Sequence, residues 1–95
     1  MKKINFKKFP LYTNIEKTDI RYIDIHKEFA ELLYNRGDGI VAHMLSHLIY
    51  ESNEAVEIDD KQEAYLVQFI KTFCTPAMIE SFEELIENKK VVNGI

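Results

Sequence analysis

The stretch from Gly39 to Ser52 constrains the fold of this chain more than any other. On a helical wheel at about 100° per residue, its apolar side chains cover an arc of roughly 200°, which is wider than the stripe of an ordinary surface helix. These side chains are Ile40, Val41, Ala42, Met44, Leu45, Leu48 and Ile49. We therefore predict a helix that other elements cover on more than one side. Its open face would hold His43, Ser46, His47 and Tyr50.

A second core helix is predicted over Asp60–Cys74. Asp59 and Asp60 are each followed, three residues later, by Gln62 and Glu63, so either pair makes a capping box. The apolar side chains of this segment again cover roughly 200° of the wheel; they are Tyr65, Leu66, Val67, Phe69, Ile70, Phe73 and Cys74. We expect the two apolar helices to pack against each other.

Three segments have the period of strands. Lys2–Phe9 alternates at its start and is expected to end at Pro10, because proline cannot donate to a ladder. Asp19–Ile25 alternates and is rich in isoleucine and tyrosine, and Val56 and Ile58 flank Glu57 in a short third segment. We predict that the first two strands pair antiparallel and that the third joins them in one three-stranded, mainly antiparallel sheet.

Two further helices complete the prediction. One begins at His26 with Asp24 as its N-cap and ends at Gly37, which suits the left-handed position after a helix. Asp38 would cap the next helix, and Gly39 would allow its tight entry. The other runs from Pro76 to about Asn88 behind the N-cap Thr75, with inward residues Met78, Ile79, Phe82, Leu85 and Ile86.

These elements predict a single α+β domain over residues 1–95, in the order β-β-α-α-β-α-α, with 91–95 as a tail. The sheet would cover one side of the two core helices. A chain of 95 residues buries only about 60–65% of its unfolded surface, so self-association would help its stability. One cysteine excludes an intrachain disulfide. No signal peptide or transmembrane run is apparent, and we expect a cytoplasmic protein without a membrane partner.

Charge is distributed unevenly along the chain. The net charge is −4, but the first ten residues carry four lysines and no acid, so the remainder carries −8. An acidic body argues against a nucleic-acid partner. The alternative is a nucleic-acid-binding module that uses the lysine-rich N-terminus, although such lysines commonly protect an edge strand from pairing. They are Lys2, Lys3, Lys7 and Lys8.

His43 and His47 are the main metal-ligand candidates. Their i, i+4 spacing puts both imidazoles on one helix face, and Glu51 continues the row. Met44 stands where a zinc protease needs its general-base glutamate, so the protease interpretation fails. A metal-binding protein that uses these residues is one functional alternative; the other interpretation is two histidines at the polar edge of a core helix.

Other groupings are weaker. A nucleophilic set of Cys74, His26 and Asp24 lacks a recognisable cysteine motif, and Cys74 falls on an apolar arc, where a thiol behaves as a small hydrophobe. The turn Asn35–Gly39 lacks the lysine of a phosphate-binding loop and is expected only to join helices. A pair of helices flanking Cys74 resembles a helix-turn-helix in spacing, but its second helix carries too many acids for DNA. The acids Glu57, Asp59, Asp60, Glu80, Glu83, Glu84 and Glu87 form no calcium loop, and the last four are expected on a solvated face or against a basic partner.

The functional expectation is therefore a small interaction or regulatory protein, not an enzyme, which acts by protein–protein contact or as a homodimer and needs no cofactor. Its aromatic content exceeds what one small core is expected to hide, as judged from Tyr12, Tyr22, Tyr34, Tyr65 and Phe69. Lysine outnumbers arginine ten to two and isoleucine occurs twelve times, which is typical of AT-rich bacterial or phage genomes. A phage or mobile-element accessory protein fits this composition.

Overall fold

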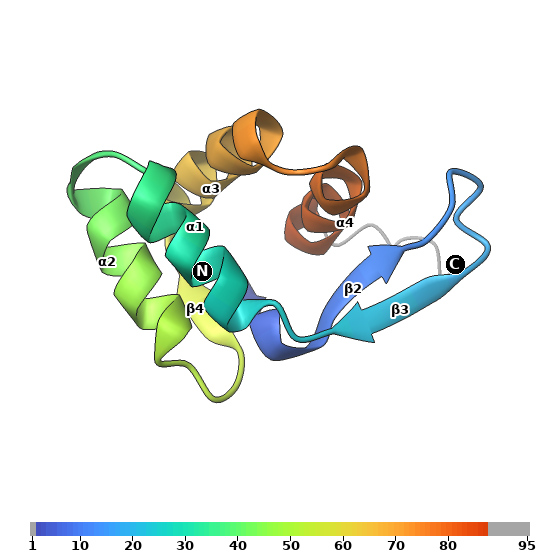
Figure 1. Cartoon of the computed structure of the whole chain (residues 1–95), viewed down its shortest axis with the longest axis horizontal. Coiled ribbons are helices and arrows are strands. Elements are labelled where there is room, and N and C mark those ends of the chain that lie inside the picture. The colour runs from blue at the N-terminus through green and yellow to red at the C-terminus, as the bar shows by residue number, and fades with distance from the viewer. Residues whose placement is uncertain (1, 88–95) are drawn as a thin grey trace.

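The two sheets of this chain lie at different ends of an elongated molecule of 39 × 24 × 24 Å. A computed structural model describes residues 2–87 and shows an α+β fold. Helices α1–α3 gather with strands β1 and β4 at one end, the β2–β3 hairpin forms the other end, and α4 lies between them (Figure 1). The elements in order are β1 (Lys2–Ile4), the 3₁₀ turn η1 (Phe6–Lys8), β2 (Phe9–Tyr12), β3 (Ile20–Ile23), α1 (His26–Arg36), α2 (Gly39–Tyr50), β4 (Val56–Ile58), α3 (Asp60–Phe73) and α4 (Pro76–Glu87).

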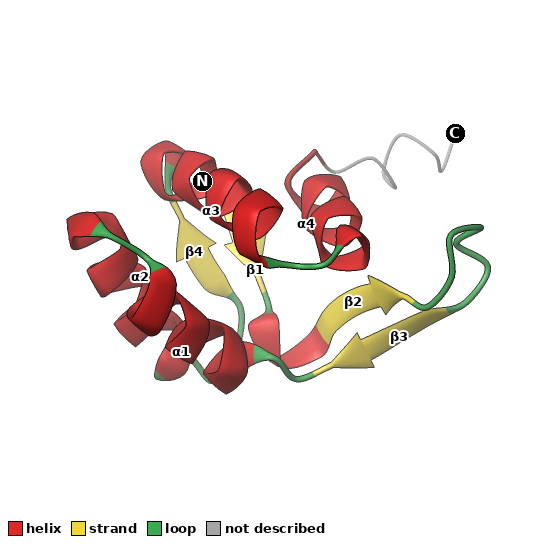
Figure 2. Cartoon of the chain, turned by 45° about the horizontal axis from the view of Figure 1, so that its top comes forward, coloured by secondary structure: helices red, strands yellow, loops and turns green. Residues whose placement is uncertain are grey.

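The strands form two separate two-stranded antiparallel sheets, so the predicted three-stranded sheet is wrong (Figure 2). β1 pairs with β4, and β2 pairs with β3. The expected first strand, Lys2–Phe9, is split because the Asn5 side chain accepts a 2.9 Å hydrogen bond from the backbone N–H of Lys7 and caps the η1 turn. This turn lets Phe6 and Phe9 both enter the core.

Pro10 was predicted to end a strand. It lies instead inside β2, opposite Tyr22. A two-stranded sheet has only edge strands, and an edge position tolerates a residue that cannot donate to the ladder. The neighbouring pair Tyr12 and Ile20 lies on the same face of the hairpin as Pro10 and Tyr22.

The core lies between the β1–β4 sheet and the helices. Phe6 stacks on Phe9 and Phe29, and Phe29 meets Phe69 edge to face. Leu45 of α2 and Ile70 of α3 are almost fully buried, and the two helices are in contact, which confirms the expected packing. The most extensive contact between helices, however, is that of α1 with α2.

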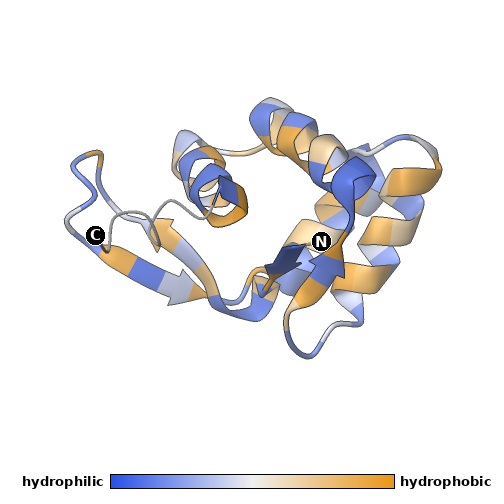
Figure 3. Ribbon diagram, turned by 180° about the vertical axis from the view of Figure 1, so that it is seen from behind, coloured by the Kyte–Doolittle hydropathy of each residue, from blue (hydrophilic) through white to orange (hydrophobic). Residues whose placement is uncertain are grey.

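Helix α2 contacts both α1 and α3, but part of its predicted apolar arc is left exposed. Ile40, Met44 and Leu48 are 67%, 58% and 43% exposed, whereas Ser46, expected on the open face, is buried. Seen from behind, α2 is a largely orange, apolar ribbon at the edge of the molecule (Figure 3). The wheel identified the apolar arc correctly, but the elements of residues 2–87 cover only part of it. Phe73 at the end of α3 is similarly 42% exposed.

Two of the four predicted helix caps hold. Asp59 and Gln62 form the capping box of α3, and the Thr75 hydroxyl accepts from the N–H of Met78. The N-cap of α1 is Ile25 instead of Asp24. Asp38 occupies the N-cap of α2, but its side chain makes no cap hydrogen bond.

Gly37 is required for space and not for a left-handed conformation. Its φ is −75°, whereas Gly39 has a φ of +82°. A Cβ added at Gly37 would lie 2.6 Å from the carbonyl oxygen of Leu33 and 2.7 Å from Cβ of Ala42. The close approach of α1 and α2 therefore explains this glycine.

Within the described part of the chain, helix α4 runs from Pro76 to Glu87. Its inward residues are as expected, since Phe82 and Ile86 are buried and Met78, Ile79 and Leu85 pack partly against the core. The predicted tail, 91–95, lies outside the described residues.

Candidate functional site

The outer face of α2 carries three apolar side chains that the rest of the described chain leaves exposed. Ile40, Met44 and Leu48 follow one another at intervals of four residues, so they form one stripe along the helix, which we call the α2 stripe. From Gly39 to Tyr50 the helix contains no aspartate, glutamate, lysine or arginine. An exposed apolar stripe without charged neighbours on its own helix is a feature of interaction surfaces.

His43 and His47 lie beside the α2 stripe and contact each other. Their ring centroids are 4.9 Å apart, with an angle of 61° between the planes, and the ring of Tyr34 lies 5.9 Å from that of His47. The two histidines line a shallow depression together with Met44, Leu48 and Gln62. The predicted spacing is thus realised as a pair of adjacent imidazoles.

A complete metal centre needs more ligands than this pair. Glu51 borders a second depression with His47, between α1 and α2. Among residues 2–87, no three side chains of histidine, cysteine, aspartate or glutamate are grouped so that they could hold a metal ion. Metal binding by His43, His47 and Glu51 therefore stays a prediction. The two histidines are neighbours that could each supply one ligand.

The structure pairs His26 with Asp24. Oδ1 of Asp24 accepts hydrogen bonds from Nδ1 of His26 at 2.6 Å and from its backbone N–H at 3.1 Å. These two bonds, the side-chain one first, hold the pKa of Asp24 below its usual value. Cys74 is half-buried at the end of α3, and burial raises the pKa of its thiol, which lowers the fraction of reactive thiolate.

The acids of α4 meet lysines of the same chain. Glu84 Oε2 lies 2.7 Å from Lys17 Nζ, Glu80 lies 4.0 Å from the same nitrogen, and Glu83 lies 3.6 Å from Lys71. The basic partner considered for this row is thus supplied in part by the hairpin loop and by α3. Glu84 is more than a solvated charge, because it connects α4 to the hairpin.

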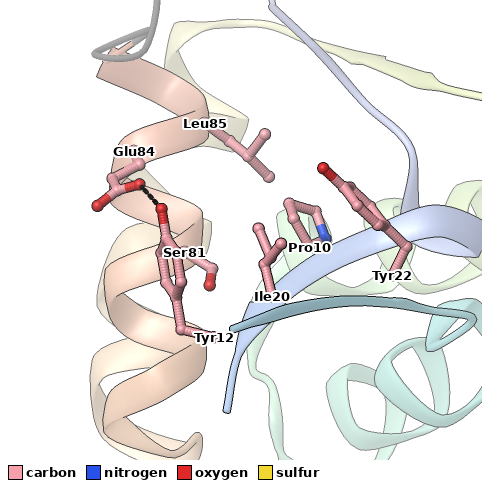
Figure 4. Close-up of a pocket in the computed structure, with 7 residues that line it drawn as sticks. All are labelled: Pro10, Tyr12, Ile20, Tyr22, Ser81, Glu84 and Leu85. Carbon is pink, nitrogen blue, oxygen red and sulfur yellow. Dashed lines mark hydrogen bonds between the residues drawn. The ribbon is translucent and has the colours of Figure 1, made fainter. Parts of the chain in front are cut away.

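A small cavity lies where the hairpin meets α4 (Figure 4). Its volume is about 90 Å³, and the residues that line it are Pro10, Tyr12, Ile20, Tyr22, Ser81, Glu84 and Leu85. The Tyr12 hydroxyl donates a 2.7 Å hydrogen bond to Oε1 of Glu84 at its rim. Ser81 is 2% exposed, and among residues 2–87 its hydroxyl has no hydrogen-bond partner.

Tyr12 and Lys17 both contact Glu84, and we call these three residues the polar clamp. Lys17 Nζ also lies 5.3 Å from the centre of the Tyr12 ring. The pKa values of Tyr12 and Lys17 are both raised. In each case the largest cause is the hydrogen bond to Glu84. Both shifts favour the protonated donors that hold the hairpin against α4.

The N-terminal lysines are divided between two elements. Lys2 and Lys3 belong to β1, where Lys2 Nζ lies 3.2 Å from Glu63, while Lys7 and Lys8 belong to the η1 turn. At the helix-joining turn, Asp38 accepts from the Tyr65 hydroxyl, and its own backbone N–H donates to that hydroxyl. The turn therefore places the carboxylate of Asp38 at the start of α2, where it would repel a bound anion.

Sequence reasoning missed the cavity and the clamp. Tyr12 and Glu84 are far apart in sequence, and nothing in their local patterns indicates their contact. Ser81 offered a signal, because it lies four residues before Leu85 and next to Phe82 on the inward side of a predicted amphipathic helix. A hydroxyl at such a position needs a partner, which local sequence cannot identify.

No described helix is both long enough and apolar enough to cross a bilayer. The aromatic surplus is resolved in part, since Phe69 is buried and Tyr65 half-buried, whereas Tyr22 and Tyr34 are 66% and 64% exposed. Comparison of the chain with protein-family models, with curated proteins and with solved structures found no match.

Proposed function

We propose that this protein acts through protein–protein contact and self-associates as a homodimer through the α2 stripe. The observation that carries the proposal is the exposure of Ile40, Met44 and Leu48 on one helix that has no charged side chain. Burial of such a stripe contributes roughly 25 cal/mol per Å² of apolar surface. For a chain with little margin of stability, that contribution matters.

A second copy is the occupant that the stripe fits best. Most homodimers have two-fold symmetry, in which one surface meets itself. Ile40 and Leu48 lie at equal distances in sequence from Met44, so two antiparallel α2 helices would place Met44 against its own copy and Ile40 against Leu48. The helix presents no charge that would repel its copy, whereas a partner with a charged face would find no counter-charge there.

Sedimentation equilibrium of the purified chain and of Met44→Glu tests the proposal. We expect a dimer whose dissociation constant rises about 100-fold or more in the variant, because two like charges would face each other at the axis. Ile15→Glu is the matched control, since Ile15 is 95% exposed in the hairpin loop, far from α2, and should leave the dimer unchanged. Circular dichroism checks that both variants fold.

Two outcomes would refute this arrangement. A chain that remains monomeric at millimolar concentration does not self-associate. A dimer that Met44→Glu leaves intact, and that Ile15→Glu dissociates, uses the hairpin loop and not the α2 stripe.

A further inference from the structure

The hydroxyl of Ser81 is the one buried side-chain oxygen or nitrogen that lacks a hydrogen-bond partner among residues 2–87. Buried polar groups are normally paired, and an unpaired one destabilises the fold. Ser46 provides a comparison within the same chain. It is 3% exposed on α2, and its hydroxyl donates a 2.8 Å hydrogen bond to the carbonyl oxygen of His43. Ser81 also borders a cavity, but its hydroxyl makes no such bond with any of the residues 2–87.

The cavity has apolar walls and a polar end. Leu85, Pro10 and Ile20 lie around it, the side chain of Ser81 comes from α4 on one side, and that of Tyr22 comes from β3 on the other (Figure 4). An apolar cavity of roughly 150 Å³ holds a benzene molecule. A cavity of about 90 Å³ therefore suits a group of about four non-hydrogen atoms.

The charge at the rim selects against anions. Oε1 of Glu84 accepts from the Tyr12 hydroxyl, and Oε2 lies 2.7 Å from Lys17 Nζ, so this carboxylate is held in place at the cavity. The carboxylate of an anionic ligand in the cavity would be repelled by Glu84 and would also lose its hydration. A cation would find Glu84 already paired with Lys17. An uncharged polar group avoids both penalties.

We propose that this cavity is a binding site for a compact uncharged group of about four non-hydrogen atoms, such as a primary amide or a branched alcohol, which pairs with the Ser81 hydroxyl. The aliphatic part of the group packs against Leu85, Pro10 and Ile20, and its oxygen or nitrogen satisfies Ser81. Tyr22, which is 66% exposed, forms the mouth of the site. The site is separate from the α2 stripe, so it does not depend on the proposed dimer.

A ligand titration followed by ¹H–¹⁵N NMR of the whole chain tests the site. Acetamide and isopropanol are neutral probes of the right size, and acetate is the anionic counterpart of acetamide. We expect acetamide to shift the amide signals of Ser81, Leu85 and Tyr22 with a dissociation constant on the order of 10 mM. Acetate should bind at least 10-fold more weakly. Equal effects of acetamide and acetate, or no saturable shift with either neutral probe, would overturn the proposal.

A pair of serine variants assigns the binding to the hydroxyl. Ser81→Ala should weaken acetamide binding 10-fold or more and raise Tm by about 5 °C, because it removes an unpaired buried hydroxyl. Ser46→Ala is the same substitution in another helix, but it removes the existing hydrogen bond to the His43 carbonyl. It should therefore leave acetamide binding unchanged and should not raise Tm. If Ser81→Ala instead lowers Tm and leaves the titration unchanged, the hydroxyl has a partner within the chain and the proposal fails.

The uncharged group can belong to a free small molecule or to the end of a larger one. N-acetyl-asparagine amide carries the acetamide group on a longer neutral stem and distinguishes these sources. Shifts at Ser81 with both compounds indicate that the mouth at Tyr22 admits the end of a chain. Shifts with acetamide alone indicate a site for free small molecules, and shifts with neither compound exclude the site.

Discussion

The two small sheets of this protein have the same pairing but differ in what stabilises them. In the β1–β4 sheet, three side chains of one face, Ile4, Val56 and Ile58, are 1–4% exposed and belong to the core. In the β2–β3 hairpin, all four residues of β3 are exposed. An isolated two-stranded hairpin is marginally stable in water. The comparison indicates that pairing alone holds neither sheet. Burial on both strands holds the first, whereas the second is held by Phe9 of β2, which lies in the core, and by α4 with the polar clamp.

The largest expected difference follows from shortening one isoleucine in each sheet. Ile58→Ala should lower the free energy of unfolding by about 2–5 kcal/mol, because it leaves a cavity at a fully buried position. Ile20→Ala should lower it by less than about 1 kcal/mol, since Ile20 is 40% exposed. Urea unfolding followed by circular dichroism measures both values. Should Ile58→Ala fail to fold, Ile58→Val is expected to cost about 0.5–1.5 kcal/mol.

Equal losses at Ile58 and Ile20 would contradict the comparison. They would mean that the hairpin carries as much of the apolar stabilisation as the sheet in the core.

A smaller effect is expected from removing one atom of the polar clamp. Tyr12→Phe loses the hydrogen bond to Glu84 and should cost about 1 kcal/mol, because bonds to charged groups are strong but this one is partly exposed to solvent. Hydrogen exchange should accelerate in β2 and β3 and not in β1 and β4. Tyr22→Phe is the control, since Tyr22 is mostly exposed and should leave both measurements unchanged. Uniform acceleration in both sheets would show that the clamp is not specific to the hairpin.

The mildest perturbation of the hairpin is a rise in pH. The pKa values of Tyr12 and Lys17 are raised from 10.0 and 10.5 by their bonds to Glu84. A raised pKa in the folded state stabilises the protonated form, so the contribution is complete below pH 10 and is lost as the pH rises through the shifted values. We expect the hairpin amides to lose protection in that range before the β1–β4 sheet does. Tyr12→Phe should reduce this alkaline step, and a step of the same size in the variant would exclude Tyr12 as its cause.

Local sequence patterns determined the helices, most strand segments and two caps. The capping box at Asp59 and the proline at the start of α4 act within a few residues, so one sequence is enough to recognise them. The apolar arcs of α2 and α3 were likewise correct, and Leu45 and Ile70 are buried as expected.

Tertiary structure alone decided which strands pair, which apolar faces are covered and what Ser81 and Glu84 contact. The split of the first strand depends on how Asn5 caps a turn when Phe6 and Phe9 have a core to enter. The exposure of Ile40 and Met44 depends on how much surface the other elements can cover, which is a property of the whole chain. Such contacts join residues that are distant in sequence. A periodic pattern shows which face of its own segment is apolar, but not which segment packs against that face.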